Sequence, residues 1–244
     1  MDGDGDEDLF LTNWQLEANA LYISNLINDY DPRTRRSSFR DASVYAGLGR
    51  VAFGVTSWGA VLFDLECDGD LDLFVANGYT SPDYQGTGIC VGQPNHLFLG
   101  QGDGRFEDVS ARAGPALAVA LPSRAVVGCD YDQDGDLDLL ITANNGPVQL
   151  LRNEAPRAGH WLGLRLRGAN GNTAAIGAEV TVELDGRVIR RSLRAGSGYL
   201  GGNPPELLLG LGAAPERVTV KVRWPSGEHS RHELPTDRWT ILRE

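Results

Sequence analysis

The sequence predicts an all-β protein in which a repeated multi-strand unit is followed by a small β-sandwich. Three observations support this prediction. The chain of 244 residues contains 31 Gly and 12 Pro, which favours many turns over long helices. An acidic loop followed by a short apolar strand occurs three times, and the composition changes at about Gly159.

The repeat has a period of about 65 residues. Asp8, Asp72 and Asp138 occupy the same place in the three copies and lie 64 and 66 residues apart. Each copy continues with two short apolar strands: LFLTN and ALYIS, then LFVAN and HLFLG, then LLITAN and VQLLRN. A third element with the pattern Phe-x-Asp-x-Ser occurs at 39–43 and 106–110. The unit therefore has three or four strands.

These segments are rich in Val, Leu, Ile and Phe and are bounded by Gly, Asn and Asp, as strands joined by tight turns are. A unit of this length is compatible with a propeller blade, although the shorter WD40 and kelch periods do not fit it, and neither does the nonapeptide period of calcium-binding β-helices. We therefore interpret residues 1–155 as a partial β-propeller with an incomplete first blade. So few blades cannot close a ring, and we expect the open edges to be covered by upstream blades or by self-association.

The segment 159–244 is predicted to be a separate β-sandwich. It holds 12 of the 22 Lys and Arg but only nine acidic residues, and it does not continue the repeat. Apolar and polar residues alternate in 161–166, 178–184 and 217–224, as in half-buried strands. The dipeptide at 185–186 is Asp-Gly, which favours a type I′ hairpin.

The acidic residues are concentrated in three short windows. Residues 2–8, 64–72 and 130–138 hold 15 of the 33 Asp and Glu, although the net charge of the whole chain is only −11. Five carboxylates within seven to nine residues repel one another and would destabilise a compact state unless a cation neutralises them. The distribution of charge therefore predicts bound metal.

The third window has the pattern D-x-D-x-D-G-D-x-D, which suits Ca²⁺. Side chains at positions 1, 3, 5 and 9, a backbone carbonyl at position 7 and Gly135 at the sharp turn can supply most of the six to eight oxygen ligands. An EF-hand is excluded, because its twelfth-position Glu is replaced by Val75 and Ile141. A Mg²⁺ or two-metal catalytic site would need carboxylates from separate segments, whereas each loop here is self-contained.

All three loops are predicted to bind Ca²⁺ through their acidic side chains. The first loop is expected to be the weakest, since its position 1 would precede Met1, and Glu at position 3 of the second loop is expected to weaken that site. The predicted metal residues are Asp2, Asp4, Asp6, Asp8, Asp64, Glu66, Asp68, Asp70, Asp72, Asp130, Asp132, Asp134, Asp136 and Asp138.

The segments FDLECDGDLDLFVANG and DYDQDGDLDLLITANNGPVQLLRNE resemble the FG-GAP (VCBS-type) repeats of integrin-α-like propellers. The tail resembles the ASPIC/UnbV domain at 160–162, 176–178, 196–199 and 222–227. This domain commonly follows such repeats in cartilage-acidic-protein-like proteins. The resemblance implies Ca²⁺ in the second and third loops and a secreted or cell-surface protein, although residues 1–30 contain no signal segment.

We therefore expect a calcium-binding extracellular module for adhesion or ligand binding, with an unidentified protein or glycan as its partner and no enzymatic activity. Ser197 and the pair His229 and His232 match no catalytic arrangement, so no catalytic residue is predicted. The alternative is an accessory region of a secreted enzyme whose catalytic segment lies upstream. No nucleic-acid motif and no apolar run long enough to span a membrane is present.

Two further features of the sequence leave alternatives open. Arginine recurs in the tail at 187, 190, 191 and 194, and this basic strip could meet an acidic glycan, nucleic acid or the acidic repeats themselves. The three cysteines, at 67, 90 and 129, permit at most one internal disulfide.

Overall fold

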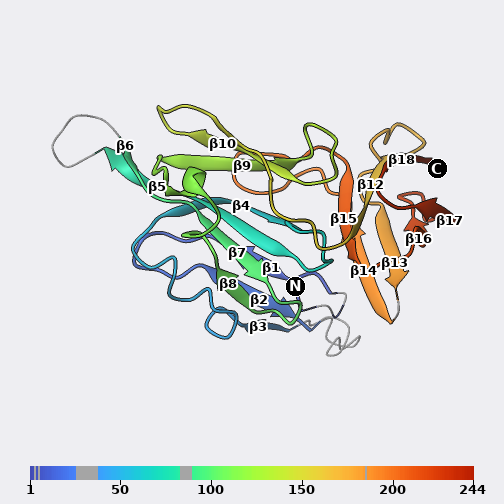
Figure 1. The fold of residues 1–244 in the computed structure, drawn as a ribbon, viewed down its shortest axis with the longest axis horizontal. Helices are drawn as coiled ribbons and strands as arrows, with labels where there is room; N and C mark the ends of the chain where they lie inside the picture. The colour runs from blue at the N-terminus through green and yellow to red at the C-terminus, as the bar shows by residue number, and fades with distance from the viewer. Residues whose placement is uncertain (3, 5, 26–37, 83–89, 185) are drawn as a thin grey trace.

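The computed structural model describes residues 1–244 apart from 3, 5, 26–37, 83–89 and 185, and it confirms an all-β fold (Figure 1). In these described residues the single helical element is a 3₁₀ turn, η1 (Pro115–Ala118). No helix found there is long and apolar enough to cross a membrane.

The strands of the repeats form three sheets, stacked from the lower to the upper side of Figure 1. The sheet orders are β1-β2-β3, then β4-β5-β7-β8 with β6 paired to β5, then β9-β10-β11. The strand bounds are β1 (Leu9–Leu11), β2 (Ala20–Ser24), β3 (Phe39–Asp41), β4 (Ser57–Phe63), β5 (Asp72–Pro82), β6 (Cys90–Gly92), β7 (His96–Gly100), β8 (Phe106–Asp108), β9 (Ser123–Cys129), β10 (Asp138–Ala143) and β11 (Gln149–Leu151).

Two strands that precede acidic loops, β4 and β9, were not anticipated from the sequence. Each pairs antiparallel with the strand after its loop, so that Phe63 lies opposite Asp72 and Cys129 lies opposite Asp138. Gly59 interrupts the apolar pattern of β4, so the sequence does not predict this strand. The packing of β4 against β9 requires a glycine at this position. A Cβ on Gly59 would lie 2.8 Å from the backbone of β9. The second and third loops are therefore the connections of antiparallel hairpins.

Two apolar cores lie between the three sheets. The core between the first and second sheets contains Leu21, Ile23, Ala42, Ala46, Leu48, Leu73, Val75, Phe98 and Phe106. The core between the second and third sheets contains Val61, Phe63, Phe74, Ala76, Leu97, Val109, Leu117, Val126, Leu139 and Ile141. Each sheet after the first therefore buries one face against the sheet before it, as stacked repeat units do.

The tail forms two sheets, with the orders β15-β12-β18 and β14-β13-β16-β17. The strand bounds are β12 (His160–Arg167), β13 (Glu179–Leu184), β14 (Arg187–Ser192), β15 (Leu207–Gly212), β16 (Arg217–Arg223), β17 (His229–Pro235) and β18 (Trp239–Arg243). Its core draws only on residues between Leu162 and Leu242 and includes the fully buried Trp224. The division into 1–155 and 159–244 remains a prediction.

The predicted hairpin of the tail and the state of the cysteines can both be compared with the structure. The hairpin is present as β13 and β14, which pair from Leu184 and Arg187 outward, while Asp185 itself lies outside the described residues. Cys67 and Cys129 are free thiols. The side chain of Cys90 lies outside the described part of the chain.

Candidate metal centre

The second and third acidic loops share one backbone conformation. Positions 4 and 6 have positive φ angles in both loops: 60° at Cys67 and 94° at Gly69, then 62° at Gln133 and 95° at Gly135. Glycine at position 6 avoids the steric cost that other residues pay there. The two loops are therefore the same turn, built twice.

The first aspartate of each loop holds the turn together. In the second loop, Oδ1 of Asp64 accepts the N–H of Asp68 (3.1 Å) and Oδ2 accepts the N–H of Gly69 (2.8 Å). Asp130 makes the same two bonds in the third loop, to positions 5 and 6, at 3.1 and 3.0 Å. Backbone N–H groups of its own loop thereby fix each of the two carboxylates.

The last aspartate of each loop ties it to a neighbouring segment of its own repeat. Oδ1 of Asp72 accepts the N–H of Gly100 at 2.8 Å, and Oδ1 of Asp138 accepts the N–H of Asn153 at 2.8 Å. The corresponding oxygen of Asp8, in the first loop, accepts the N–H of Ser24 at 2.9 Å. Position 9 therefore serves the same structural purpose in all three repeats.

Three carboxylates of the third loop converge on one point. One oxygen each from Asp130, Asp132 and Asp138 lies within 4.8 Å of the others, and this is the one such acidic, His or Cys group within the described parts of the chain. These are hard oxygen donors from positions 1, 3 and 9 of one short loop, the donor set that Ca²⁺ prefers. The cluster could hold a metal ion.

Burial raises the pKa of the carboxylates in both loops. It raises the pKa of Asp64 to about 7, with the charge of Asp68 adding to the effect, and the pKa of Asp72 to about 8. Burial also raises the pKa of Asp130 and of Asp138. Without a cation, Asp64 and Asp72 thus resist ionisation near neutral pH, because charge is poorly solvated where they lie.

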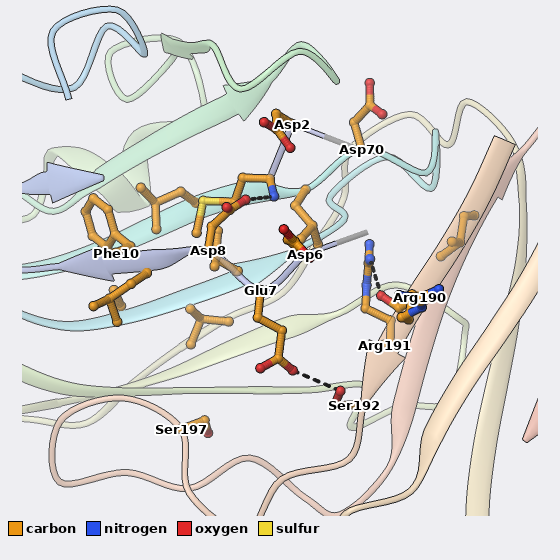
Figure 2. Close-up of a pocket in the computed structure, with 18 of the residues that line it drawn as sticks. Asp2, Asp6, Glu7, Asp8, Phe10, Asp70, Arg190, Arg191, Ser192 and Ser197 are labelled. Carbon is orange, nitrogen blue, oxygen red and sulfur yellow. Dashed lines mark hydrogen bonds and ion pairs between the residues drawn. The ribbon is translucent and has the colours of Figure 1, made fainter. Parts of the chain in front are cut away.

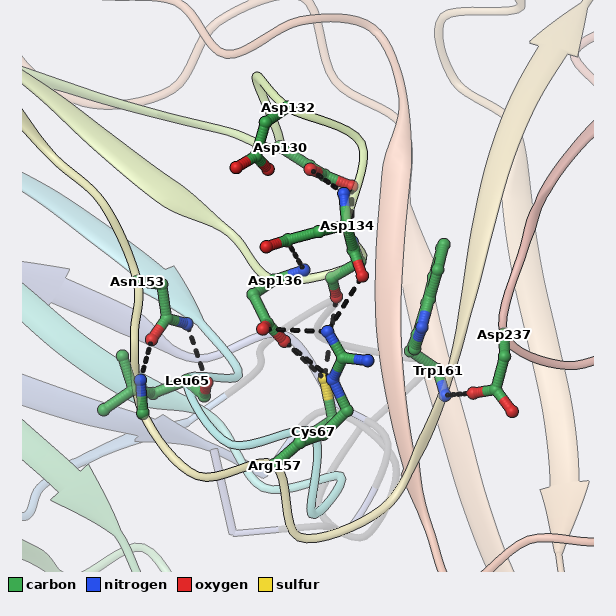
Figure 3. Close-up of polar contacts among 12 residues, drawn as sticks. Leu65, Cys67, Asp130, Asp132, Asp134, Asp136, Asn153, Arg157, Trp161 and Asp237 are labelled. Carbon is green, nitrogen blue, oxygen red and sulfur yellow. Dashed lines mark hydrogen bonds and ion pairs between the residues drawn. The ribbon is translucent and has the colours of Figure 1, made fainter.

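In the second and third loops, an arginine binds the carboxylate at position 7. Arg187, from β14, pairs with the carboxylate of Asp70 and donates to the carbonyl of Asp68 at 3.1 Å. Arg157 pairs with the carboxylate of Asp136 at 2.8 Å and donates to the carbonyl of Asp134 at 2.8 Å (Figure 3). At position 7 the carboxylate is therefore bound to a guanidinium. This leaves the backbone carbonyl oxygen of position 7 as the metal ligand that the loop pattern predicts.

The remaining acidic side chains of the two loops are less convergent. Asp134 faces Arg152 at 3.5 Å, and the same arginine lies 3.1 Å from Asp132 of the convergent group. Glu66 is half-buried, and burial raises its pKa. For the acidic residues outside the convergent group, metal ligation remains a prediction from the sequence.

The tail packs directly on the second and third acidic loops, through contacts beyond the basic strip that the sequence alone did not reveal. Nε1 of Trp239 donates to Oδ2 of Asp130 at 3.0 Å, and the N–H of Gly212 donates to the carbonyl of Cys67 at 2.9 Å. Trp161 lies against the third loop, where a Cβ on Gly135 would come within 2.1 Å of its ring. The loops thus form part of the junction between the repeats and the tail.

Replacing Gly135 with alanine is expected to destabilise the protein strongly. The positive φ costs about 1–2 kcal/mol for a residue with a Cβ, and displacing Trp161 adds about 1–3 kcal/mol. Gly171→Ala is the matched control, because Gly171 has a similar φ of 88° with nothing within 4 Å of the new Cβ. Denaturant unfolding of both variants measures the difference. Equal losses would contradict the close packing at Gly135.

The first loop faces the basic strip of the tail across a hollow of about 1570 Å³ (Figure 2). Glu7 pairs with Arg194 and accepts the hydroxyl of Ser192 at 3.0 Å. The N–H of Asp6 donates to Asp4 at 2.8 Å, as positions 7 and 5 do in the other loops. Of the three partners considered for the basic strip, the structure shows the acidic repeats.

Comparison with known families supports both halves of this architecture. Residues 64–141 match the model of an FG-GAP-like repeat, and residues 168–244 match the model described as ASPIC and UnbV. A comparison with curated proteins gave no match. Domains of these two kinds are generally accessory or non-catalytic modules, and FG-GAP repeats are typically extracellular.

Proposed function

We propose that this chain, which carries an FG-GAP-like repeat followed by an ASPIC/UnbV domain, is a calcium-stabilised extracellular binding module without catalytic activity. The convergence of Asp130, Asp132 and Asp138 is the observation that carries the calcium assignment. Ca²⁺ would supply the positive charge that balances these three carboxylates, of which Asp130 and Asp138 are buried. The hydrogen-bond frame shared with the second loop supports a second, similar site.

The metal loops would then have a structural role at the domain junction. Asp130 accepts a hydrogen bond from Trp239 of the tail, and the second loop is held by Arg187 and by the backbone of Gly212. An ion that orders these loops would also order the surface on which the tail packs. Binding of Ca²⁺ would therefore stabilise the junction as well as the repeats.

The binding function is inferred from the domain classes and from the position of the loops. With its carboxylates engaged by backbone N–H groups and arginines, each loop is framed as a structural site rather than as an open catalytic one. Adhesion or capture of a protein or glycan, the role expected from the sequence, fits an accessory module of this kind.

Isothermal titration of the metal-free chain with Ca²⁺, and separately with Mg²⁺, tests the assignment. We expect two Ca²⁺ sites of appreciable affinity and much weaker Mg²⁺ binding, because Mg²⁺ demands a tighter octahedral shell and keeps several waters. Asp132→Asn should remove one site. Absence of Ca²⁺ binding, or equal affinity for both ions, would contradict the proposal.

Calcium affinity is expected to depend on pH near neutrality. In the metal-free fold, burial raises the pKa of Asp64 to about 7 and that of Asp72 to about 8, so both carboxyls hold protons below those values. Because Ca²⁺ must displace these protons, its affinity should fall as the pH drops from 8 to 6, by up to about tenfold per proton per pH unit. Titrations in two buffers of different ionisation enthalpy would measure the released protons; a pH-independent affinity would contradict the prediction.

A further inference from the structure

The first sheet exposes an apolar face whose counterpart in the second sheet is buried. The repeat aligns Leu9 with Leu73, and each pairs across its sheet with an aromatic residue, Tyr22 or Phe98. Residues opposite one another in an antiparallel pair, and alternate residues along a strand, share a face. Leu9, Leu11, Tyr22 and Phe39 therefore form one face of the first sheet, here named the leading face.

Exposure differs sharply between the two copies of this face. Leu9, Leu11 and Phe39 are 49%, 40% and 48% exposed. Their equivalents in the second sheet, Leu73, Val75 and Phe106, are 0%, 0% and 7% exposed, because the first sheet covers them. The leading face thus has the side chains of an interface between sheets, but no sheet in the described part of the chain covers it.

The third sheet exposes the complementary face. By the same register, Leu140 and Leu150 correspond to Phe74 and Leu97. Phe74 and Leu97 are 1% and 6% exposed beneath the third sheet. Leu140 and Leu150, here named the trailing face, are 38% and 48% exposed.

We propose that the leading face of one copy of this chain binds the trailing face of a second copy. The two sheet-to-sheet contacts already present within the chain join a trailing face to a leading face, so the same contact in trans would bury the exposed residues at both ends. Such an interface is heterologous, and it leads either to a closed ring or to an open chain. It is independent of the metal proposal.

Sedimentation velocity of two single-face variants tests this pairing, in the presence of Ca²⁺. Leu11→Glu places a charge on the leading face, and Leu150→Glu places one on the trailing face. The wild-type chain should associate as concentration rises, whereas each variant alone should associate at least tenfold more weakly. An equimolar mixture of the two variants should form a dimer and nothing larger. The intact trailing face of the Leu11→Glu variant would bind the intact leading face of the Leu150→Glu variant, and only the two charged faces would stay unpaired.

The control is Leu200→Glu, which changes a leucine that is 80% exposed in the tail and should leave association unchanged. Circular dichroism and the melting temperature check that all three variants fold, as expected for exposed positions. A wild-type chain that stays monomeric at all accessible concentrations would overturn the proposal. So would association of either single-face variant alone that is as strong as that of the wild-type chain, since the pairing of leading with trailing faces would then not be what holds the copies together.

Discussion

Asp130→Asn is expected to abolish calcium binding at the third loop and to destabilise the metal-free chain as well. The carboxylate of Asp130 accepts three hydrogen bonds, from the N–H groups of Asp134 and Gly135 and from Nε1 of Trp239. The side chain of asparagine has one oxygen, and an NH₂ group replaces the second carboxylate oxygen. At least one of the three donors would therefore face this NH₂ group and lose its acceptor. An unsatisfied buried donor costs about 1–3 kcal/mol.

Asp132→Asn is the matched control for this variant. Asp132 belongs to the same convergent group, but it is exposed and forms an ion pair with the exposed Arg152. It should lose calcium affinity while the metal-free stability stays nearly constant. Chemical denaturation with and without Ca²⁺ separates the two effects. Unchanged metal-free stability in Asp130→Asn would show that its hydrogen-bond frame is not needed for folding.

Trp161→Ala should have the second large effect, at the junction of repeats and tail. Its side chain is buried, packs against Gly135 and meets Trp239 edge-on at a centroid distance of 6.3 Å. Removing a buried tryptophan costs about 3–5 kcal/mol. Because the third loop loses its support, calcium affinity should also fall. Both quantities can be measured by denaturant unfolding across a Ca²⁺ series.

Trp14→Ala is the control for this substitution, since Trp14 lies in the repeats and is 50% exposed. It should change stability little and calcium affinity not at all. If Trp161→Ala lowered stability without changing calcium affinity, the contact between Trp161 and the third loop would have no bearing on the metal site.

Local pattern predicted much of the fold. The apolar segments after each acidic loop are β1, β5 and β10, and the Phe-x-Asp-x-Ser elements contain β3 and β8. The Asp-Gly turn identified the hairpin of β13 and β14. In each case the signal lies within about ten residues, where strand and turn preferences act directly.

The features that the sequence did not reveal depend on contacts between distant segments. β4 was missed because Gly59 interrupts its pattern, and that glycine is explained only by the backbone of β9. The parallel pairing of β12 with β18 joins residues that are 76 positions apart in the sequence, such as Gly163 and Trp239. No local signal identifies such pairs.

The sequence likewise predicted some features of the candidate metal site and missed others. The spacing of the acids identified Asp130, Asp132 and Asp138 and the turn at Gly135. It gave no sign that Arg157 would bind the carboxylate of Asp136, or that the tail would donate a hydrogen bond into the loop. The first contact depends on the path of the segment before the tail and the second on how the tail packs, and the spacing of the acids encodes neither.

Differential scanning calorimetry of the chain in EDTA and in saturating Ca²⁺ tests most directly whether calcium joins the two halves. At a free concentration one hundred times the Kd, each site would add about 2.7 kcal/mol of stability. We expect one cooperative transition in Ca²⁺ and, in EDTA, an earlier transition of the repeats separate from that of the tail, whose core is self-contained. Identical traces under both conditions would contradict a calcium-stabilised junction.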